Sequence, residues 1–312
     1  MWTSVLPIHH PHKGAQMRRI SRIAAPLLAL GLVLAACGDD GSSSTDETAA
    51  AAETATADTT AAATEETTAP ADAADGAVDV ASLGLIEDGK LTVCTDAPYP
   101  PFEFQDEATK EWTGFDMDIV REIAAGIGEG LELAVTVQPF DGIWLAPKAG
   151  TCDMVASAMT ITDERKANAL FTDGYFDADQ SLLVRAEDKD TLTSLEALAG
   201  KTIAVQTGTT GETYAQENAK DATLKSFDEP AAMFLALEGK QVDAILQDLP
   251  VNAERALKDA KTTLTATFPT GEQYGFAVAQ DNTALGDALN AGIAELKSNG
   301  KYDEIYAKYF AK

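Results

Sequence analysis

Histidine is almost missing from this chain of 312 residues, because its only three histidines, His9, His10 and His12, lie close to the N-terminus. The rest of the sequence therefore lacks the commonest general base of enzymes. It also has no P-loop, no Gly-x-Gly-x-x-Gly motif and no cluster of residues with metal-ligand spacing. No nucleophile is accompanied by a visible base. The sequence thus predicts a protein that is not an enzyme and that uses no cofactor and no metal.

Basic residues are also scarce, with 23 lysines and arginines against 50 aspartates and glutamates, a net charge of −27. Four of the basic residues and none of the acidic ones lie in residues 1–36, so the remainder is still more acidic. Binding to nucleic acid by counterion release needs clustered lysine and arginine. The charge therefore excludes nucleic acid as a partner, and it favours a soluble protein that stays away from anionic surfaces.

The apolar run at residues 23–35 is shorter than the roughly 20 residues that a membrane span needs. It follows three arginines and ends in small residues, which is the pattern of a secretory signal peptide. Met17 is the more natural start of such a segment. We therefore predict a signal peptide within residues 1–36 that begins at Met17.

The sequence Leu-Ala-Ala-Cys that ends at Cys37 closes this signal. It resembles the lipobox of bacterial lipoproteins, in which the cysteine receives a diacylglycerol and becomes the new N-terminus. Two acyl chains give a stable membrane tether. The resemblance implies that Cys37 is lipidated and that the protein is held on the outer face of the bacterial cell membrane by this anchor only.

Residues 37–83 are predicted to be a linker. From 38 to about 79 they are almost all Ala, Thr, Asp, Glu, Ser and Gly, with no aromatic and no basic residue. Such a segment buries too little apolar surface to offset the entropy cost of ordering it. We expect a flexible leash between the lipid and a folded domain.

Residues 84–312 alternate short β-rich runs with amphipathic stretches and are numerous enough for two compact lobes. The alternation indicates an α/β fold with mainly parallel sheet, and the pattern restarts near residue 201. We expect Asp116 to cap the first helix. The expected strands are 91–94, 153–157, 201–205 and 242–246, and the expected helices are 119–127, from about 212, 231–238, 285–296 and 302–309.

Six short motifs occur in this part of the chain: 95–104 (TDAPYPPFEF), 114–118 (GFDMD), 140–143 (FDGI), 157–166 (SAMTITDERK), 206–211 (QTGTTG) and 242–248 (VDAILQD). In this order and spacing they resemble the amino-acid branch of type II periplasmic binding proteins, the solute receptors of ABC importers. The resemblance implies two Rossmann-like lobes, each with a central mixed sheet, joined by a two-strand hinge. Lobe 1 would comprise about 84–183 and 276–312, and lobe 2 about 184–275, with crossings near 181–185 and 274–278.

An amino-acid zwitterion needs a cation for its carboxylate and an anion for its ammonium, both shielded from water. By resemblance, Arg165 binds the carboxylate, helped by the Thr160 hydroxyl and by the backbone N–H of Thr210. Arginine suits this role because its planar guanidinium donates two hydrogen bonds side by side. By the same resemblance, Asp248 binds the ammonium, helped by the Ala158 carbonyl and by Thr160.

The resemblance also assigns the ligand side chain to one group of residues. Tyr99 and Phe140 match the pair that sandwiches it, and Asp96, Gln206 and Gln247 fall where its distal end is recognised. Asp96 would suit a cationic tip, whereas the two glutamines would suit an amide. The motifs leave both options open.

Cys94 and Cys152 remain once Cys37 is modified, in an oxidising compartment. The strands next to them are neighbours in the family's sheet, so the resemblance implies either a disulfide or two separately buried thiols. Trp144, about one turn after Phe140, is expected in the core.

The resemblance thus implies a monomeric receptor that binds a polar or basic L-amino acid, closes around it and delivers it to an ABC permease. Two alternatives remain. A ligand-sensing subunit of a membrane receptor would use the same binding chemistry, and some proteins of similar fold are dehydratases of prephenate-like acids.

Overall fold

The computed structural model describes residues 78–128 and 130–310. The predicted signal peptide, Cys37 and most of the predicted linker lie outside these residues. Within the described part of the chain, no helix combines the length and the apolar character that crossing a membrane requires. The folded part begins before residue 84, because Leu83 is buried in the core of the first lobe and its carbonyl accepts a hydrogen bond from Asn282 Nδ2 (2.9 Å).

The first lobe is built on a mixed sheet with the strand order β4–β1–β5–β12–β6. β1 (Lys90–Thr95) lies between β4 (Glu132–Val137) and β5 (Met154–Val155) and is parallel to both. β12 (Ala277–Ala279) is antiparallel to β5 and to β6 (Ala169–Phe171). The chain therefore returns to this sheet after it has built the second lobe.

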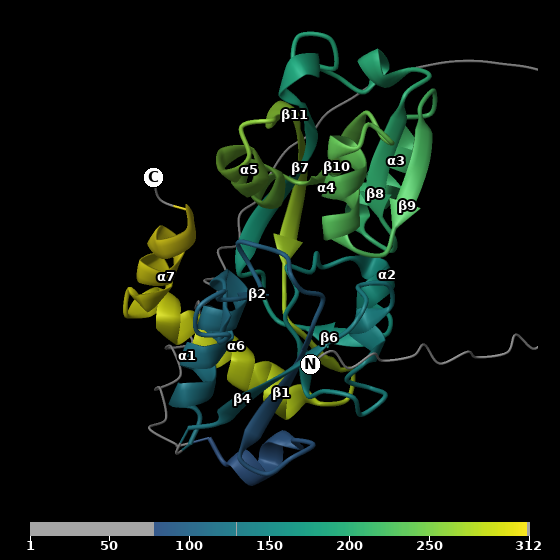
Figure 1. Ribbon diagram of the computed structural model, residues 1–312. Coiled ribbons are helices and arrows are strands. Elements are labelled where there is room, and N and C mark those ends of the chain that lie inside the picture. The colour runs from purple at the N-terminus through teal and green to yellow at the C-terminus, as the bar shows by residue number, and fades with distance from the viewer. Residues whose placement is uncertain (1–77, 129, 311–312) are drawn as a thin grey trace, which may run out of the picture. The chain divides into compact units, whose positions relative to one another are not determined.

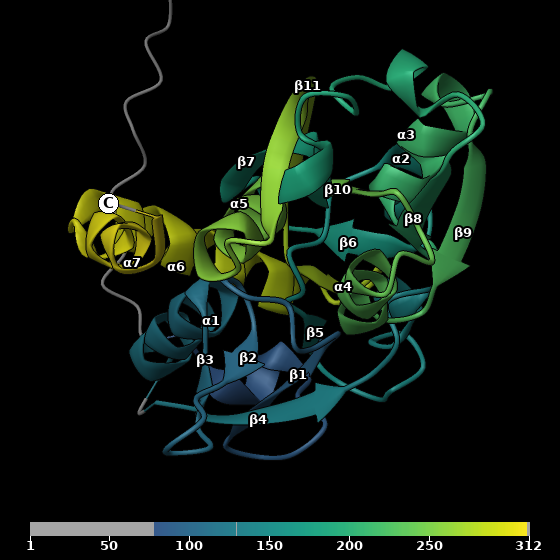
Figure 2. The same cartoon turned by 45° about the horizontal axis from the view of Figure 1, so that its top comes forward.

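Three helices of the first lobe, α1 (Phe115–Gly126), α6 (Thr283–Ser298) and α7 (Lys301–Phe310), contact one another (Figure 2). The predicted apolar faces of α1 and α6 are buried. The two helices approach closely at Gly292, where an added Cβ would lie 2.7 Å from the side chain of Ile123. The short hairpin of β2 (Phe104–Gln105) and β3 (Trp112–Thr113) and the single turn α2 (Asp163–Lys166) complete this lobe.

The second lobe is built on a mixed sheet with the order β11–β7–β10–β8–β9. β8 is parallel to β9 and β10, whereas β7 is antiparallel to β10 and β11. Helices α3, α4 and α5 contact the strands of this sheet (Figure 1). The elements of this lobe are β7 (Phe176–Arg185), β8 (Thr202–Gln206), α3 (Thr210–Asn218), β9 (Thr223–Phe227), α4 (Pro230–Glu238), β10 (Ala244–Asp248), α5 (Leu249–Lys258) and β11 (Thr262–Tyr274).

The chain crosses between the lobes twice, once within β7 and once near the end of β11. Figure 1 shows β7 and β11 side by side, and their ladder already pairs Phe176 with Tyr274. Phe176 and Tyr274 pack against Phe102 of the first lobe, whereas β7 pairs with β10 of the second lobe only from Gln180 onward. The first crossing therefore lies within β7, just before the expected range 181–185. The prediction of two α/β lobes, each with a mixed sheet, is confirmed.

Asp116 does not cap α1, contrary to the sequence-based expectation. Helix α1 begins after Gly114, and Asp116 is a fully buried residue of its first turn. Its Oδ2 accepts hydrogen bonds from the backbone N–H of Ala158 (2.8 Å) and from the Tyr175 hydroxyl (2.7 Å). The carboxylate therefore fixes the loop after β5 rather than the end of its own helix.

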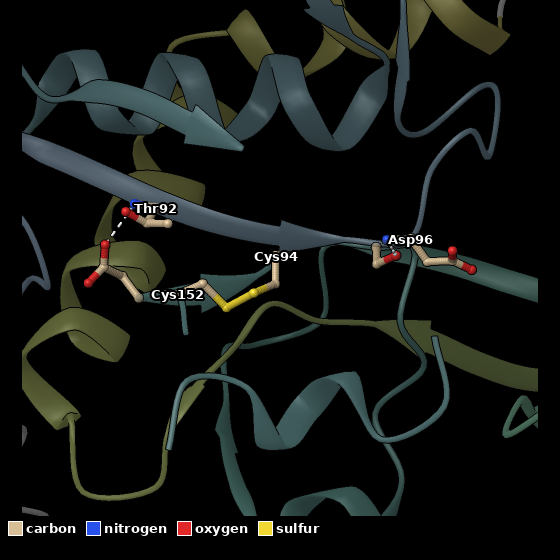
Figure 3. Close-up of a disulfide and its surroundings, with 6 residues drawn as sticks. Thr92, Cys94, Asp96 and Cys152 are labelled. Carbon is tan, nitrogen blue, oxygen red and sulfur yellow. Dashed lines mark hydrogen bonds between the residues drawn. A yellow bond between two sulfur atoms is a disulfide. The ribbon is translucent and has the colours of Figure 1, made fainter. Parts of the chain in front are cut away.

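A disulfide joins Cys94 in β1 to Cys152 just before β5, with 5.7 Å between the two Cα atoms (Figure 3). The two strands are paired neighbours in the first sheet, which brings the cysteines within bonding distance. Figure 3 also shows Asp96 just beyond the end of the same strand β1. The crosslink therefore lies close to the strand end that carries Asp96.

Candidate functional site

Strand ends from both sheets converge on one cavity. In the first lobe β1 is followed by Asp96, and β5 is followed by Ser157 and Ala158. In the second lobe β8 ends at Gln206 and β10 ends at Asp248. Within each lobe the two strands are parallel, so their carboxyl ends share one edge of the sheet, where open α/β sheets bind ligands. The space between these residues that no atom fills is about 400 Å³ and includes open solvent, so the enclosed part of the cavity is smaller.

All ten residues that the sequence analysis assigns to a ligand line this cavity. The first lobe contributes Asp96, Tyr99, Phe140, Ala158, Thr160 and Arg165, and the second contributes Gln206, Thr210, Gln247 and Asp248. The wall also includes Glu103, Ser157 and Thr209, which were not predicted. A molecule in the cavity would therefore touch both lobes.

Arg165 lies on α2. Thr162 caps the start of this helix, because its hydroxyl accepts a hydrogen bond from the Arg165 backbone N–H (3.2 Å). Its guanidinium donates to the carbonyl of Thr160 (2.7 Å) and, across the lobes, to the carbonyl of Gly208 (3.0 Å). Burial lowers the pKa of Arg165 to about 10. The negative charges of Asp248 and other acids act in the opposite direction and only partly offset this. The guanidinium is therefore a buried cation at neutral pH.

Two aromatic rings enclose this guanidinium. The carbon Cζ of Arg165 lies 5.1 Å from the ring centre of Phe140 and 5.0 Å from that of Trp144, within the range of a cation–π contact. Trp144 packs against the neighbouring core cluster, as expected, but it is only partly buried and also holds Arg165. Sequence reasoning missed this second role.

Asp248 is buried at the end of β10 and accepts hydrogen bonds at both oxygens. Oδ1 accepts from Gln180 Nε2 (2.6 Å) and Oδ2 accepts from the hydroxyl of Tyr274. Burial raises the pKa of Asp248 to about 7, and the nearby charge of Glu272 acts in the same direction. The two hydrogen bonds and the charge of Arg165 act in the opposite direction. A cation beside Asp248 would restore its charged form.

Gln180, Glu272 and Tyr274 are site residues that the sequence analysis did not identify. They lie on β7 and β11, the two strands at the crossings. Side chains two residues apart on a strand point to the same face, so Glu272 and Tyr274 share a face of β11. The spacing of two residues between Glu272 and Tyr274 indicates this shared face only if residues 262–274 are first recognised as a strand.

A wider hollow, which we call the outer groove, adjoins the cavity at the Arg165 end. It shares Thr160, Arg165, Thr209 and Thr210 with the cavity. Further wall residues of the outer groove are Trp144, Tyr214, Glu217, Pro269, Thr270 and Glu272.

Gln247 and Glu103 form a further part of the cavity wall. Gln247 donates its Nε2 to Asn252 Oδ1 (2.8 Å), while its buried Oε1 accepts no hydrogen bond from any described residue. Glu103 accepts from Ser157 through Oε1 (3.1 Å), and within the same part of the chain its buried Oε2 also lacks a donor. Burial raises the pKa of Glu103 well above its ordinary value, and Asp116 raises it further.

Asp96 adds an acceptor to the cavity wall. Its Oδ2 accepts a hydrogen bond from Gln206 Nε2 (2.5 Å), which also donates to the carbonyl of Asp228 (3.1 Å). Burial raises the pKa of Asp96 to about 6, with Glu229 acting in the same direction and the Gln206 bond in the opposite one. The donors of Gln206 are therefore engaged, whereas Gln247 Oε1 remains an open acceptor.

The loop that carries Ala158 and Thr160 is held in an unusual backbone conformation. Ala158 has a φ of 43°, in the left-handed region that residues with a Cβ rarely adopt. Such strain persists only where the surroundings enforce it, and here Asp116 accepts the Ala158 N–H. The buried carboxylate of Asp116 therefore sets the position of the cavity wall.

Polar contacts join the two lobes across the cavity. Gln206 donates to Asp96, Arg165 donates to the carbonyl of Gly208, and Thr160 donates to Glu272 Oε2 (2.7 Å). The hydroxyls of Thr160 and Thr210 also lie 3.5 Å apart. Gly208 has a φ of 76°, and a Cβ there would lie 2.7 Å from Asp141. Glycine therefore permits the close approach of the lobes at this contact.

Comparisons with known proteins agree with this geometry. The family model of the bacterial extracellular solute-binding proteins, family 3, matches the sequence of residues 91–312. This match covers both lobes and every residue that lines the cavity.

Individual relatives bind amino acids, according to their names. An ABC transporter glutamine-binding protein of Bacillus subtilis (strain 168) is 31% identical over 94% of this chain and 97% of its own length. A probable histidine-binding protein of Campylobacter jejuni is 35% identical over 70% of this chain and 84% of its own length. The structure of an ancestral arginine-binding protein bound to arginine has a TM-score of 0.66 at 37% identity, covering 71% of this chain and 98% of that one.

Proposed function

Because the chain belongs to family 3 of the bacterial extracellular solute-binding proteins, we propose that it is a monomeric receptor for a cationic L-amino acid, with arginine preferred. Its relatives are amino-acid-binding proteins of ABC transporters. We propose that it likewise delivers its ligand to an ABC permease, from the outer face of the bacterial cell membrane. The anchor would be a lipid on Cys37, which the Leu-Ala-Ala-Cys sequence supports.

The set of open acceptors at the distal end of the cavity carries the choice of a cationic ligand. Asp96 and Gln247 Oε1 offer acceptors, while the amide hydrogens of Gln206 are directed at Asp96 and Asp228. A guanidinium has five donors and no acceptor. An amide tip would instead place its carbonyl oxygen among acceptors and leave a buried polar atom without a donor.

The charge balance of the site supports the same choice. Among the described residues that line the cavity, Asp96, Glu103 and Asp248 are acidic and Arg165 is the only basic one. A zwitterion adds one charge of each sign, so it leaves the acidic excess unchanged. A basic side chain adds the missing positive charge.

The other end of the cavity suits the α-carboxylate and α-ammonium groups. We assign the carboxylate to Arg165 and to the backbone N–H of Thr210, which is the first residue of α3 and has no partner within the helix. We assign the ammonium to Asp248, which a cation would return to its charged form. Since these groups lie on both lobes, a bound amino acid would shift an open state toward a closed one.

A thermal-shift screen of the purified chain against the 20 amino acids, with sugars and dipeptides as controls, tests the proposal. A ligand that binds only the folded state raises the melting temperature by mass action. We expect arginine to give the largest shift, followed by lysine or histidine. No shift with any amino acid would refute the proposal.

Glutamine is the second candidate, because the relative that covers 94% of this chain is a glutamine-binding protein. A largest shift with glutamine would move the recognition of the side-chain tip to Gln206 and Gln247. Uptake of labelled arginine in cells with and without the gene separates transport from a sensing role. Turnover of prephenate would instead reveal a dehydratase.

A further inference from the structure

The carboxylate of Glu272 accepts four hydrogen bonds at the boundary between the cavity and the outer groove. Its Oε2 accepts from the hydroxyls of Thr160 (2.7 Å) and Thr210 (2.6 Å). Its Oε1 accepts from Gln180 Nε2 (3.0 Å) and from the hydroxyl of Thr270 (2.9 Å). An ionised carboxylate has about four lone-pair positions, so these donors use its full capacity. Glu272 therefore acts on a bound molecule through the groups that it holds.

The two threonine hydroxyls are oriented by this arrangement. A hydroxyl has one hydrogen and two acceptor lone pairs, and both Thr160 and Thr210 direct their hydrogen at Glu272. Thr160 is buried and lines the cavity. It therefore presents only acceptor positions to a molecule bound there.

This orientation decides between the two roles that sequence analysis gave to Thr160. A carboxylate accepts hydrogen bonds and donates none, so it gains nothing from an acceptor. An ammonium group has three hydrogens to donate, and Asp248 is close enough to share Gln180 Nε2 with Glu272 (2.6 and 3.0 Å). Thr160 and Asp248 together suit an ammonium, which leaves the carboxylate to Arg165 and to the Thr210 N–H.

We propose that Glu272 is a positioning residue that makes binding depend on the α-ammonium group, because it holds the Thr160 hydroxyl as an acceptor beside Asp248. This inference rests on the proposed function. It adds that the site rejects an organic acid that has the same side chain but no amino group.

Isothermal titration calorimetry of the full chain with L-arginine and with its des-amino analogue, 5-guanidinopentanoate, measures this discrimination. We express it as the Kd of the analogue divided by the Kd of L-arginine. In Glu272→Gln the charge is lost and the amide nitrogen donates, so the Thr160 hydroxyl is free to turn. We expect the ratio to fall about tenfold, as for the loss of a hydrogen bond to a charged group.

Glu217→Gln is the matched control. Glu217 lies in the outer groove and is exposed. Among the described residues, the Thr160 hydroxyl is bonded to Glu272 and Thr210 and not to Glu217. The change removes the same charge from the same groove, and we expect the ratio of the wild-type chain. A ratio that falls equally in both variants would overturn the inference, because general charge would then explain it.

Thr160→Val removes the acceptor itself and should lower the ratio by a similar factor. In that background Glu272→Gln should add little, since both changes act on one contact. Independent effects would overturn the inference, as would equal losses of affinity for both compounds in Glu272→Gln. If that variant does not fold, as judged by circular dichroism, Thr160→Val alone decides, and an unchanged ratio refutes the inference. A wild-type chain that binds no amino acid would refute the proposed function first.

Discussion

Replacing Arg165 by alanine should remove most of the affinity for L-arginine. The side chain is 4% exposed and donates to the carbonyls of Thr160 and Gly208 over 2.7 and 3.0 Å. Its loss would leave the buried carboxylate of the ligand without a cation. Removing one partner of a buried ion pair costs about 3–5 kcal/mol. The lower value applies to a cavity that is partly open to solvent and corresponds to a rise of roughly a hundredfold in Kd.

Arg165→Lys tests the geometry of the contact. Lysine keeps the charge but lacks the planar pair of donors that a carboxylate and two carbonyls require. We expect a loss of about tenfold, equal to about one hydrogen bond to a charged group.

Calorimetric titration with L-arginine at pH 7.5 gives these values. Lys166→Ala is the control, because Lys166 is the next residue of α2 and pairs with Asp163 at the surface. We expect it to bind like the wild-type chain. A folded Arg165→Ala variant whose Kd lies within about threefold of the control would refute the assignment of the carboxylate to Arg165.

Four further predictions follow from the site, the crosslink and the signal sequence. Between pH 7 and pH 6 the affinity for L-arginine should fall by up to tenfold, because the raised pKa of Asp248, about 7, means that binding must first displace a proton. Asp248→Asn should bind roughly a hundredfold more weakly and lose the dependence in this pH range in calorimetric titrations. Asp96→Asn should reduce the preference for arginine over glutamine about tenfold in competition titrations, because it removes the charge at the distal end. Reduction of the Cys94–Cys152 disulfide, which spans 58 residues, should lower the free energy of unfolding by about 4 kcal/mol in chemical denaturation, and an unchanged midpoint would contradict this. Cys37→Ala should move the protein from the membrane fraction to the soluble fraction, and persistent membrane binding after a high-salt wash would place the anchor elsewhere.

The motifs next to strand ends were predictable from the sequence, because each strand there is short, apolar and followed at once by polar residues. β1, β5, β8 and β10 all have this form, and the residues that follow or end them line the cavity. The resemblance to a known family then supplied the role proposed for each of them. Local pattern and family motif agree at these positions.

The residues at the crossings were not predictable in the same way. β11 contains Pro269 and Gly271, which interrupt the apolar alternation, and its ladder with β7 shifts register between Phe268 and Glu272. Such a segment is typical of a loop, so Glu272 and Tyr274 were missed. Gln180 lies in β7 among residues that the sequence assigned to the first lobe.

Asp116 shows a different limit of sequence reasoning. An acidic residue just before an apolar helical face is typical of an N-cap. The chain buries it instead beneath the loop of Ala158, with Tyr175 as a second donor. Both contacts join residues 42 and 59 positions apart, so no local pattern encodes them.

A crystal structure of the chain grown with L-arginine tests the central claim most directly. We predict that the α-carboxylate lies within hydrogen-bond distance of the Arg165 guanidinium, the α-ammonium lies beside Asp248 and the guanidinium of the ligand lies beside Asp96. A ligand bound in the reverse orientation, or a cavity that stays empty at saturating arginine, would contradict the account.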